Sequence, residues 1–130
     1  MSALAKTDVH LRAEGSAFEY FFKALRRAML ENGDWDGKSD IIDAYIKRVP
    51  HFFPARTLDM EKCFPLGFDV EQTHNSKTPI TLTEVIAMKN YCDSYFLTLA
   101  RDYEEKRTGQ KLEFVMESRS PIKSSAQNTA

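Results

Sequence analysis

Residues 82–107, LTEVIAMKNYCDSYFLTLARDYEEKR, predict the longest helix of this 130-residue chain. Thr81 and Glu84 form a capping box at its start, and Gly109 follows its end. Apolar side chains at helical spacing cover more than half of the helix circumference. Such a helix either lies at the centre of a fold or presents a second face to a partner.

A shorter amphipathic helix is predicted over residues 16–32. Ser16 and Glu19 form a capping box at its start, and the pair Asn32-Gly33 ends it, because both residues tolerate a left-handed backbone. Its apolar stripe consists of Phe18, Phe21, Phe22, Leu25, Ala28 and Met29.

A third helix is predicted over residues 40–49. Ser39 or Asp40 serves as its N-cap, and Pro50 ends it. Its apolar stripe consists of Ile41, Ile42, Tyr45, Ile46 and Val49. The sequence therefore predicts a mainly α fold, a small three-helix domain.

The segments outside these helices show weaker patterns. Residues 55–81 have no sustained period, and we expect a long irregular connection with some local structure, such as one helical turn at 58–62. Residues 111–117 alternate like a short strand. The expected organisation is a flexible arm over 1–15, a single helical domain over 16–117 and a disordered tail over 118–130.

The composition argues against several classes of protein. Eighteen basic and nineteen acidic residues give a net charge of −1, which does not suit a protein that coats polyanions. Two cysteines are too few for a disulfide scaffold. No apolar run approaches the length of a membrane span, and residues 1–14 lack the apolar core of a secretory signal. We therefore expect a cytoplasmic protein without a membrane partner.

The sequence offers little for catalysis. His10, His51 and His74 form no metal-ligand spacing with Cys63 or Cys92. Phosphate-binding glycine loops and nucleophile elbows are also missing from the sequence. We therefore expect no enzyme, no catalytic residue, no cofactor and no small-molecule substrate.

The loop between the first two helices carries oxygen-bearing side chains at a regular spacing. It resembles the twelve-residue calcium loop of the EF-hand family, with glycine at position 6. The ligands that this resemblance implies are Asn32, Asp34, Asp36, Asp40 and Asp43. The same residues also suit a helix end, a turn and a helix start. We favour this second interpretation, because Asp43 stands where the family has a bidentate glutamate.

Residues 47–56 combine basic and aromatic side chains. RNA bases stack on exposed aromatic rings, while neighbouring Arg and Lys side chains contact phosphates. Basic residues of the first helix share one helix face and add a further patch. The candidate RNA-binding residues are Lys23, Arg26, Arg27, Lys47, Arg48, Phe52 and Arg56.

A family resemblance accompanies this segment. Residues 41–53, ending in Arg-Val-Pro-His-Phe-Phe, look like the first helix of the ProQ/FinO RNA-chaperone domain, and the resemblance covers about residues 39–100. It implies an RNA-binding protein. The glycine- and arginine-bearing hairpin of that family is not recognisable in residues 102–113.

The wide apolar arc of residues 82–107 favours a protein partner or a homodimer. Tyr91, Tyr95 and Tyr103 are the expected partner-binding residues, since a tyrosine ring buries area while its hydroxyl stays hydrated. Phe96 and Leu99 are expected in the core. We predict a non-enzymatic regulator, adaptor or inhibitor that binds a protein through a helical face. RNA binding is the alternative, and a calcium site is third.

Overall fold

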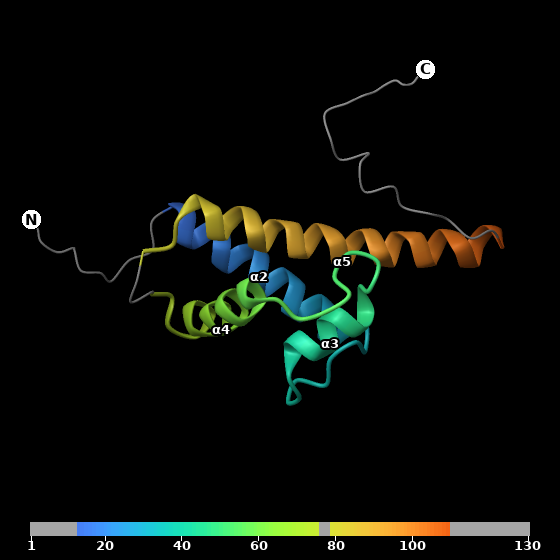
Figure 1. Cartoon of the computed structure of the whole chain (residues 1–130), viewed down its shortest axis with the longest axis horizontal. Coiled ribbons are helices and arrows are strands. Elements are labelled where there is room, and N and C mark those ends of the chain that lie inside the picture. Colours follow the sequence, from blue (N-terminus) through green and yellow to red (C-terminus); the bar gives the residue numbers. More distant parts are fainter. Residues whose placement is uncertain (1–12, 76–78, 110–130) are drawn as a thin grey trace, which may run out of the picture. The chain divides into compact units, whose positions relative to one another are not determined.

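A computed structural model describes residues 13–75 and 79–109, and in these residues all the regular structure is helical (Figure 1). The helices are α2 (Ala13–Glu31), α3 (Ile41–Arg48), α4 (Leu58–Thr73) and α5 (Leu82–Thr108). The predicted mainly α class is confirmed. The chain divides into two compact units, Met1–Leu99 and Ala100–Ala130. None of the described helices has both the length and the apolarity needed to cross a bilayer.

Helix α2 begins earlier and ends where the sequence predicts. Its first described residue is Ala13, so Ser16 lies inside the helix and the predicted N-cap is wrong. Gly33 has φ +76°, and the amide of Asp34 donates to the Met29 carbonyl at 2.8 Å. This hydrogen bond closes a Schellman motif that ends the helix.

Helix α4 replaces the irregular connection expected over 55–81, which is the main error in the predicted fold. The Thr57 side chain caps the helix by accepting a hydrogen bond from the Met60 amide at 3.1 Å. Pro65 and Gly67 lie inside it. Gly67 is buried against α2, and a Cβ at this position would collide with the ring of Phe22. The glycine therefore permits the close approach of α2 and α4.

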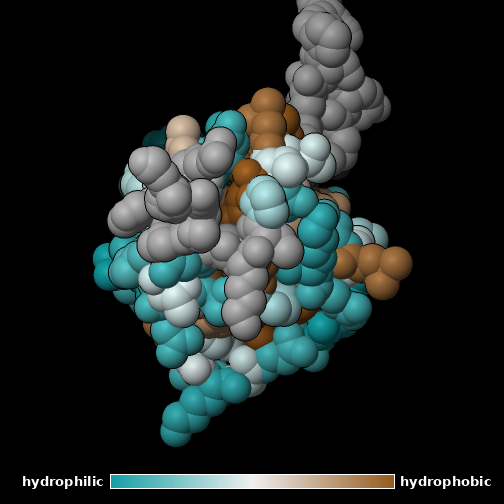
Figure 2. All heavy atoms as spheres, turned by 90° about the vertical axis from the view of Figure 1, so that its left-hand side faces the viewer, coloured by the Kyte–Doolittle hydropathy of each residue, from teal (hydrophilic) through white to brown (hydrophobic). Residues whose placement is uncertain are grey.

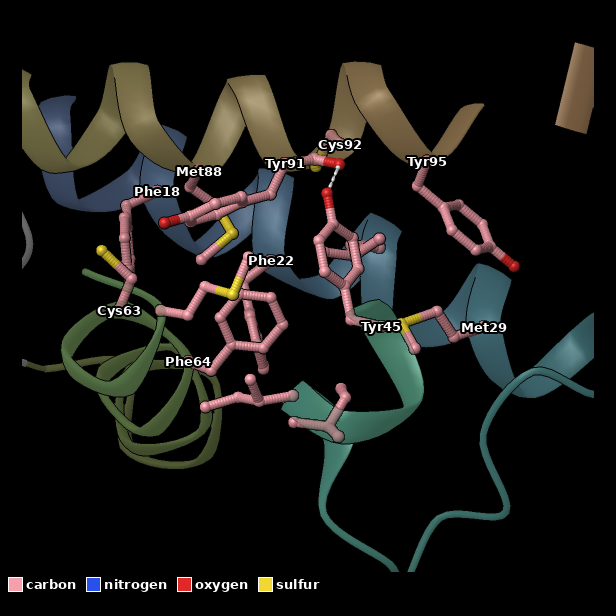
Figure 3. Close-up of a cluster of buried hydrophobic side chains, with 14 of the residues drawn as sticks. Phe18, Phe22, Met29, Tyr45, Cys63, Phe64, Met88, Tyr91, Cys92 and Tyr95 are labelled. Atoms are coloured by element: carbon pink, nitrogen blue, oxygen red, sulfur yellow. Dashed lines mark hydrogen bonds between the residues drawn. The ribbon is translucent and has the colours of Figure 1, made fainter. Parts of the chain in front are cut away.

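The core of the first unit lies among α2, α3, α4 and α5, and Figure 3 shows α5 on one side of it and α3 and α4 on the other. The Tyr45 ring lies 5.5 Å from Phe64 and 5.8 Å from Tyr91 between centroids, in edge-on arrangements that aromatic pairs prefer. The Tyr45 hydroxyl donates to the Tyr91 carbonyl at 2.6 Å (Figure 3). Three aromatic rings from three helices, together with Phe22 of α2, thus pack in one cluster with the sulfur atoms of Met29 and Met88 nearby.

The starts of α3 and α5 were predicted correctly, and in both the predicted capping side chain makes its hydrogen bond. Asp40 caps α3, accepting from the Ile42 amide at 2.8 Å. Glu84 accepts from the Thr81 amide at 2.8 Å and caps α5. The side chain of Lys62 on α4 also donates to Glu84 at 2.7 Å, which ties the start of α5 to α4.

The described part of the second unit is the end of α5. Arg107 donates to Glu104 at 2.6 Å, and Arg101 lies 3.7 Å from Glu105. Tyr103 is 68 % exposed, as expected. The predicted strand-like segment 111–117 and tail 118–130 lie outside the described residues, as does most of the predicted arm.

Candidate functional site

Helix α5 carries two apolar faces, which explains its wide apolar arc. The inner face is buried in the core and includes Val85, Met88, Tyr91, Cys92 and Tyr95. On the opposite side Leu82 is 62 %, Ile86 59 %, Phe96 43 % and Leu97 45 % exposed. We define the outer α5 face as Leu82, Ile86, Lys89, Asp93, Phe96 and Leu97. Figure 2 shows hydrophobic atoms reaching the surface among mostly hydrophilic ones at the end of the molecule where α5 begins.

The spacing of these residues places them on one side of the helix. Residues 82, 86, 89, 93 and 96 follow one another at alternating intervals of four and three, the repeat of a helix-pairing seam. At the middle of this seam the Lys89 ammonium contacts the Asp93 carboxylate at 2.8 Å. This carboxylate raises the pKa of Lys89. The outer α5 face thus has an ion pair flanked by apolar side chains.

The structure reverses the expected positions of Tyr91, Tyr95 and Phe96. Tyr91 is 3 % and Tyr95 0 % exposed, whereas Phe96 lies outside. The prediction that these two tyrosines face a partner is therefore wrong, as is the placement of Phe96 in the core. Leu99 is half-buried. A helix that is apolar on both sides gives no signal in its own sequence about which side the other helices cover.

Both buried tyrosine hydroxyls have polar partners at the edge of the core. Tyr91 donates to Asp59 on α4, and Tyr95 donates at 2.6 Å to Asp34 in the loop after α2. The pKa of both tyrosines is raised, mainly by burial and to a lesser extent by these hydrogen bonds to carboxylates. These contacts fix α5 to the rest of the unit, a role that sequence reasoning missed because the aspartates are distant along the chain.

The arginines predicted for RNA binding form ion pairs within the fold. Arg26 donates to Glu71 at 2.7 Å, which raises the pKa of the guanidinium. Arg48 lies 3.1 Å from Asp34. Lys47 and Arg27 are exposed, while Lys23 and Phe52 are half-buried. Two of the predicted cations are therefore already engaged by carboxylates.

Arg56, the third arginine, is the centre of a carboxylate cluster. It contacts Asp40 and Asp43 at 2.8 Å and Glu61 at 3.1 Å. The hydrogen bond from Arg56 is the main cause of the lowered pKa of Asp40. The cluster joins the start of α3 to the first turn of α4, so these charged side chains stabilise the packing of the two helices.

The five residues of the calcium-loop resemblance make contacts within the fold, and two of them, Asp40 and Asp43, share Arg56. Asp36 accepts from the Ser39 amide at 2.8 Å, which forms a turn and lowers the pKa of its carboxyl group. Asn32 donates to the Ala28 carbonyl at 2.8 Å, and Asp34 binds Arg48 and Tyr95. Within the described ranges no group of three metal-ligating side chains gathers. Asp40 caps α3, as predicted for the start of that helix.

The two thiols are buried inside the unit. Burial raises the pKa of both Cys63 and Cys92 to about 12. Cys92 also donates to the Phe21 carbonyl at 3.0 Å. At neutral pH both thiols are protonated and shielded, so they serve packing and are poor nucleophiles.

An open pocket of about 840 Å³ lies between the loop after α2, the start of α3 and α4. Trp35, Phe64 and Phe68 form its apolar part, and Arg56 and Glu61 lie among its polar lining residues. The Trp35 indole donates to the Ser39 carbonyl at 2.7 Å, which holds the ring in place. An apolar group fits such a lining.

Comparisons with known proteins return no match, neither to a family model, nor to a curated protein, nor to a solved structure. The resemblances to the ProQ/FinO domain and to the EF-hand loop therefore stay predictions from the sequence. The geometry of the described residues carries the functional argument.

Proposed function

We propose that this protein acts without catalysis, by binding another protein through the outer α5 face. The observation that carries the proposal is the exposure of Leu82, Ile86, Phe96 and Leu97 along one side of one helix. Large apolar side chains gathered in a patch are typical of interaction sites, whereas single ones are common on any surface. A helix face of this kind suits a groove or a second helix.

The free energy available from burying these four apolar side chains favours a modest affinity. Full burial of a large apolar side chain contributes roughly 1.5–3 kcal/mol, and these four are already about half covered, so each adds roughly 1 kcal/mol. Association costs at least several kcal/mol in lost freedom of motion. The partner must therefore supply apolar side chains of its own, and the complex is reversible.

The cysteines support a reducing compartment such as the cytoplasm for this activity. Cys63 and Cys92 lie on different helices as free, buried thiols. Disulfides are rare in reducing compartments, and unpaired buried cysteines are common there.

Site-specific photo-crosslinking in the cell that makes the protein tests this proposal. A photoreactive amino acid at Ile86 should yield a covalent adduct of higher mass. The same amino acid at Leu58, which is 84 % exposed on α4, provides the matched control and should yield little adduct. Equal adducts from both positions, or none from Ile86, would refute a binding role for this face.

A further inference from the structure

Four of the six residues of the outer α5 face are placed symmetrically about residue 91. Lys89 and Asp93 stand two residues before and after that position, and Ile86 and Phe96 stand five residues before and after it. When the helix direction is reversed, Ile86 and Phe96 exchange places, and so do Lys89 and Asp93. A pattern of this kind is complementary to itself.

Resting on the proposed function, we propose that the partner of the outer α5 face is the same face of a second copy, with the two α5 helices antiparallel. Each Lys89 then faces the partner copy's aspartate, and each Ile86 faces a phenylalanine. A two-fold axis passes beside residue 91, so both copies use the same patch, as a closed dimer requires.

The charges select the antiparallel direction. In a parallel pair each residue faces its own counterpart, so Lys89 meets lysine and Asp93 meets aspartate. Like charges placed opposite each other oppose association. In the antiparallel pair the two charge contacts are attractive, and they occur twice because of the symmetry.

Exposure and geometry both permit this pairing. The side chains of Lys89 and Asp93 are 57 % and 53 % exposed and hold each other at 2.8 Å within one chain. They exchange this contact for one across the interface without moving far. The alternating intervals of three and four keep one seam facing the partner over residues 82–96, about four turns of helix.

The concentration dependence of the mass tests whether the dimer exists. Sedimentation of the purified full chain between about 1 μM and 1 mM should show a reversible monomer–dimer equilibrium, the range in which small interfaces associate. The variant Ile86→Lys should be monomeric throughout. Leu58→Lys, which adds the same charge on α4, should dimerise like the unmodified chain. A chain that stays monomeric at the highest concentration refutes the proposal.

Charge reversal tests the register. Lys89→Asp or Asp93→Lys alone should weaken dimerisation about tenfold, because two attractive contacts become repulsive. The double variant Lys89→Asp with Asp93→Lys should regain the original affinity, as should an equimolar mixture of the two single variants. Lys47→Asp and Asp69→Lys, which change the net charge equally elsewhere, should have no effect. Single reversals that dimerise normally would overturn this register.

Disulfide trapping tests the direction. A mixture of Ile86→Cys and Phe96→Cys chains should form an inter-chain disulfide under mild oxidation, whereas either chain alone should not. Two copies of residue 86 lie about 15 Å apart in the antiparallel pair, too far for a disulfide. The native thiols are buried and do not interfere. A disulfide from Ile86→Cys alone would overturn the antiparallel arrangement.

These outcomes separate the inference from the proposed function. A monomeric purified chain that still gives a heavier adduct with another protein from Ile86 in cells would refute self-association and keep the binding role. An adduct of two copies of this chain supports both. Loss of all adducts from Ile86 refutes both.

Discussion

At the residue scale, neighbouring positions of α5 have opposite roles. Tyr95 is fully buried and donates to Asp34, whereas Phe96 lies on the outer face, with the two rings 5.4 Å apart. The sequence places hydrophobic residues at both positions, and the polar hydroxyl favours the surface for Tyr95. Tyr95 can be buried because the carboxylate of Asp34, distant along the chain, accepts the hydrogen bond of its hydroxyl inside the fold.

Truncation should therefore give opposite results at these two positions. Tyr95→Ala removes a large buried ring and should lower the free energy of unfolding by about 3–5 kcal/mol. Phe96→Ala should cost less than about 1.5 kcal/mol, because the ring is only partly covered. Urea denaturation followed by circular dichroism measures both values. Equal losses would contradict the two-faced helix.

A milder substitution isolates the hydroxyl of Tyr95. Tyr95→Phe keeps the ring and removes the donor to Asp34, so stability should fall by about 1–3 kcal/mol. Tyr103→Phe, on the exposed part of α5, is the matched control and should leave the unfolding curve unchanged. A neutral Tyr95→Phe variant would show that this hydrogen bond contributes nothing.

At the element scale, three capping signals in the sequence mark helix ends correctly, whereas the capping box at Ser16 does not. Asp40, Glu84 and the Asn32-Gly33 pair located ends of α3, α5 and α2 correctly. Helix α4 was missed because Pro65 and Gly67 disfavour a helix when the sequence is considered locally. Packing against α2 outweighs this local cost, and that packing depends on the ring of Phe22, more than forty residues away.

The variant Gly67→Ala tests this packing. Alanine favours a helix by about 1 kcal/mol over glycine, but its Cβ would collide with the Phe22 ring, which costs roughly 1–3 kcal/mol. We expect a net loss of stability. In a Phe22→Leu background, where the ring is gone, the same substitution should be neutral or stabilising. A double-mutant cycle from urea denaturation measures the difference.

The start of α5 gives a prediction for acidic pH. Hydrogen bonds from Lys62 and Thr81 lower the pKa of Glu84 from 4.5 to about 2. A carboxyl group with a depressed folded-state pKa stabilises the fold above its unfolded value and loses this contribution as pH falls toward 2. Glu84→Ala should cost about 1–2 kcal/mol at pH 7. The difference from the unmodified chain should shrink between pH 4.5 and 2, as denaturation curves at each pH would show.

At the scale of the whole molecule, the core contains several thiols and tyrosine hydroxyls whose pKa is raised. Burial raises the pKa of Cys63 and Cys92 to about 12 from 9.0, and it raises that of Tyr45, Tyr91 and Tyr95 above 10.0. In the unfolded chain these groups lose their protons at lower pH than in the fold. The unfolded state then binds fewer protons, so the fold loses stability as pH rises.

We therefore expect alkaline unfolding that begins above about pH 9, with each thiol contributing at most about 1.4 kcal/mol per pH unit. Urea denaturation between pH 7 and about 10.5 measures the slope. Cys92→Ala should be less stable at pH 7 because it leaves a cavity, but its stability should fall less steeply with pH. A slope unchanged by this substitution would contradict the role of the buried thiol.

The two buried thiols also report how often the molecule opens. A thiol-labelling reagent reaches Cys63 only when α4 separates from the helices packed on it. It reaches Cys92 only when α5 separates from α2. The labelling rates at the two sites thus measure how often two separate local openings occur, without an introduced cysteine. Equal rates mean that the helices open as one cooperative unit, whereas faster labelling of Cys63 means that α4 is the first helix to detach.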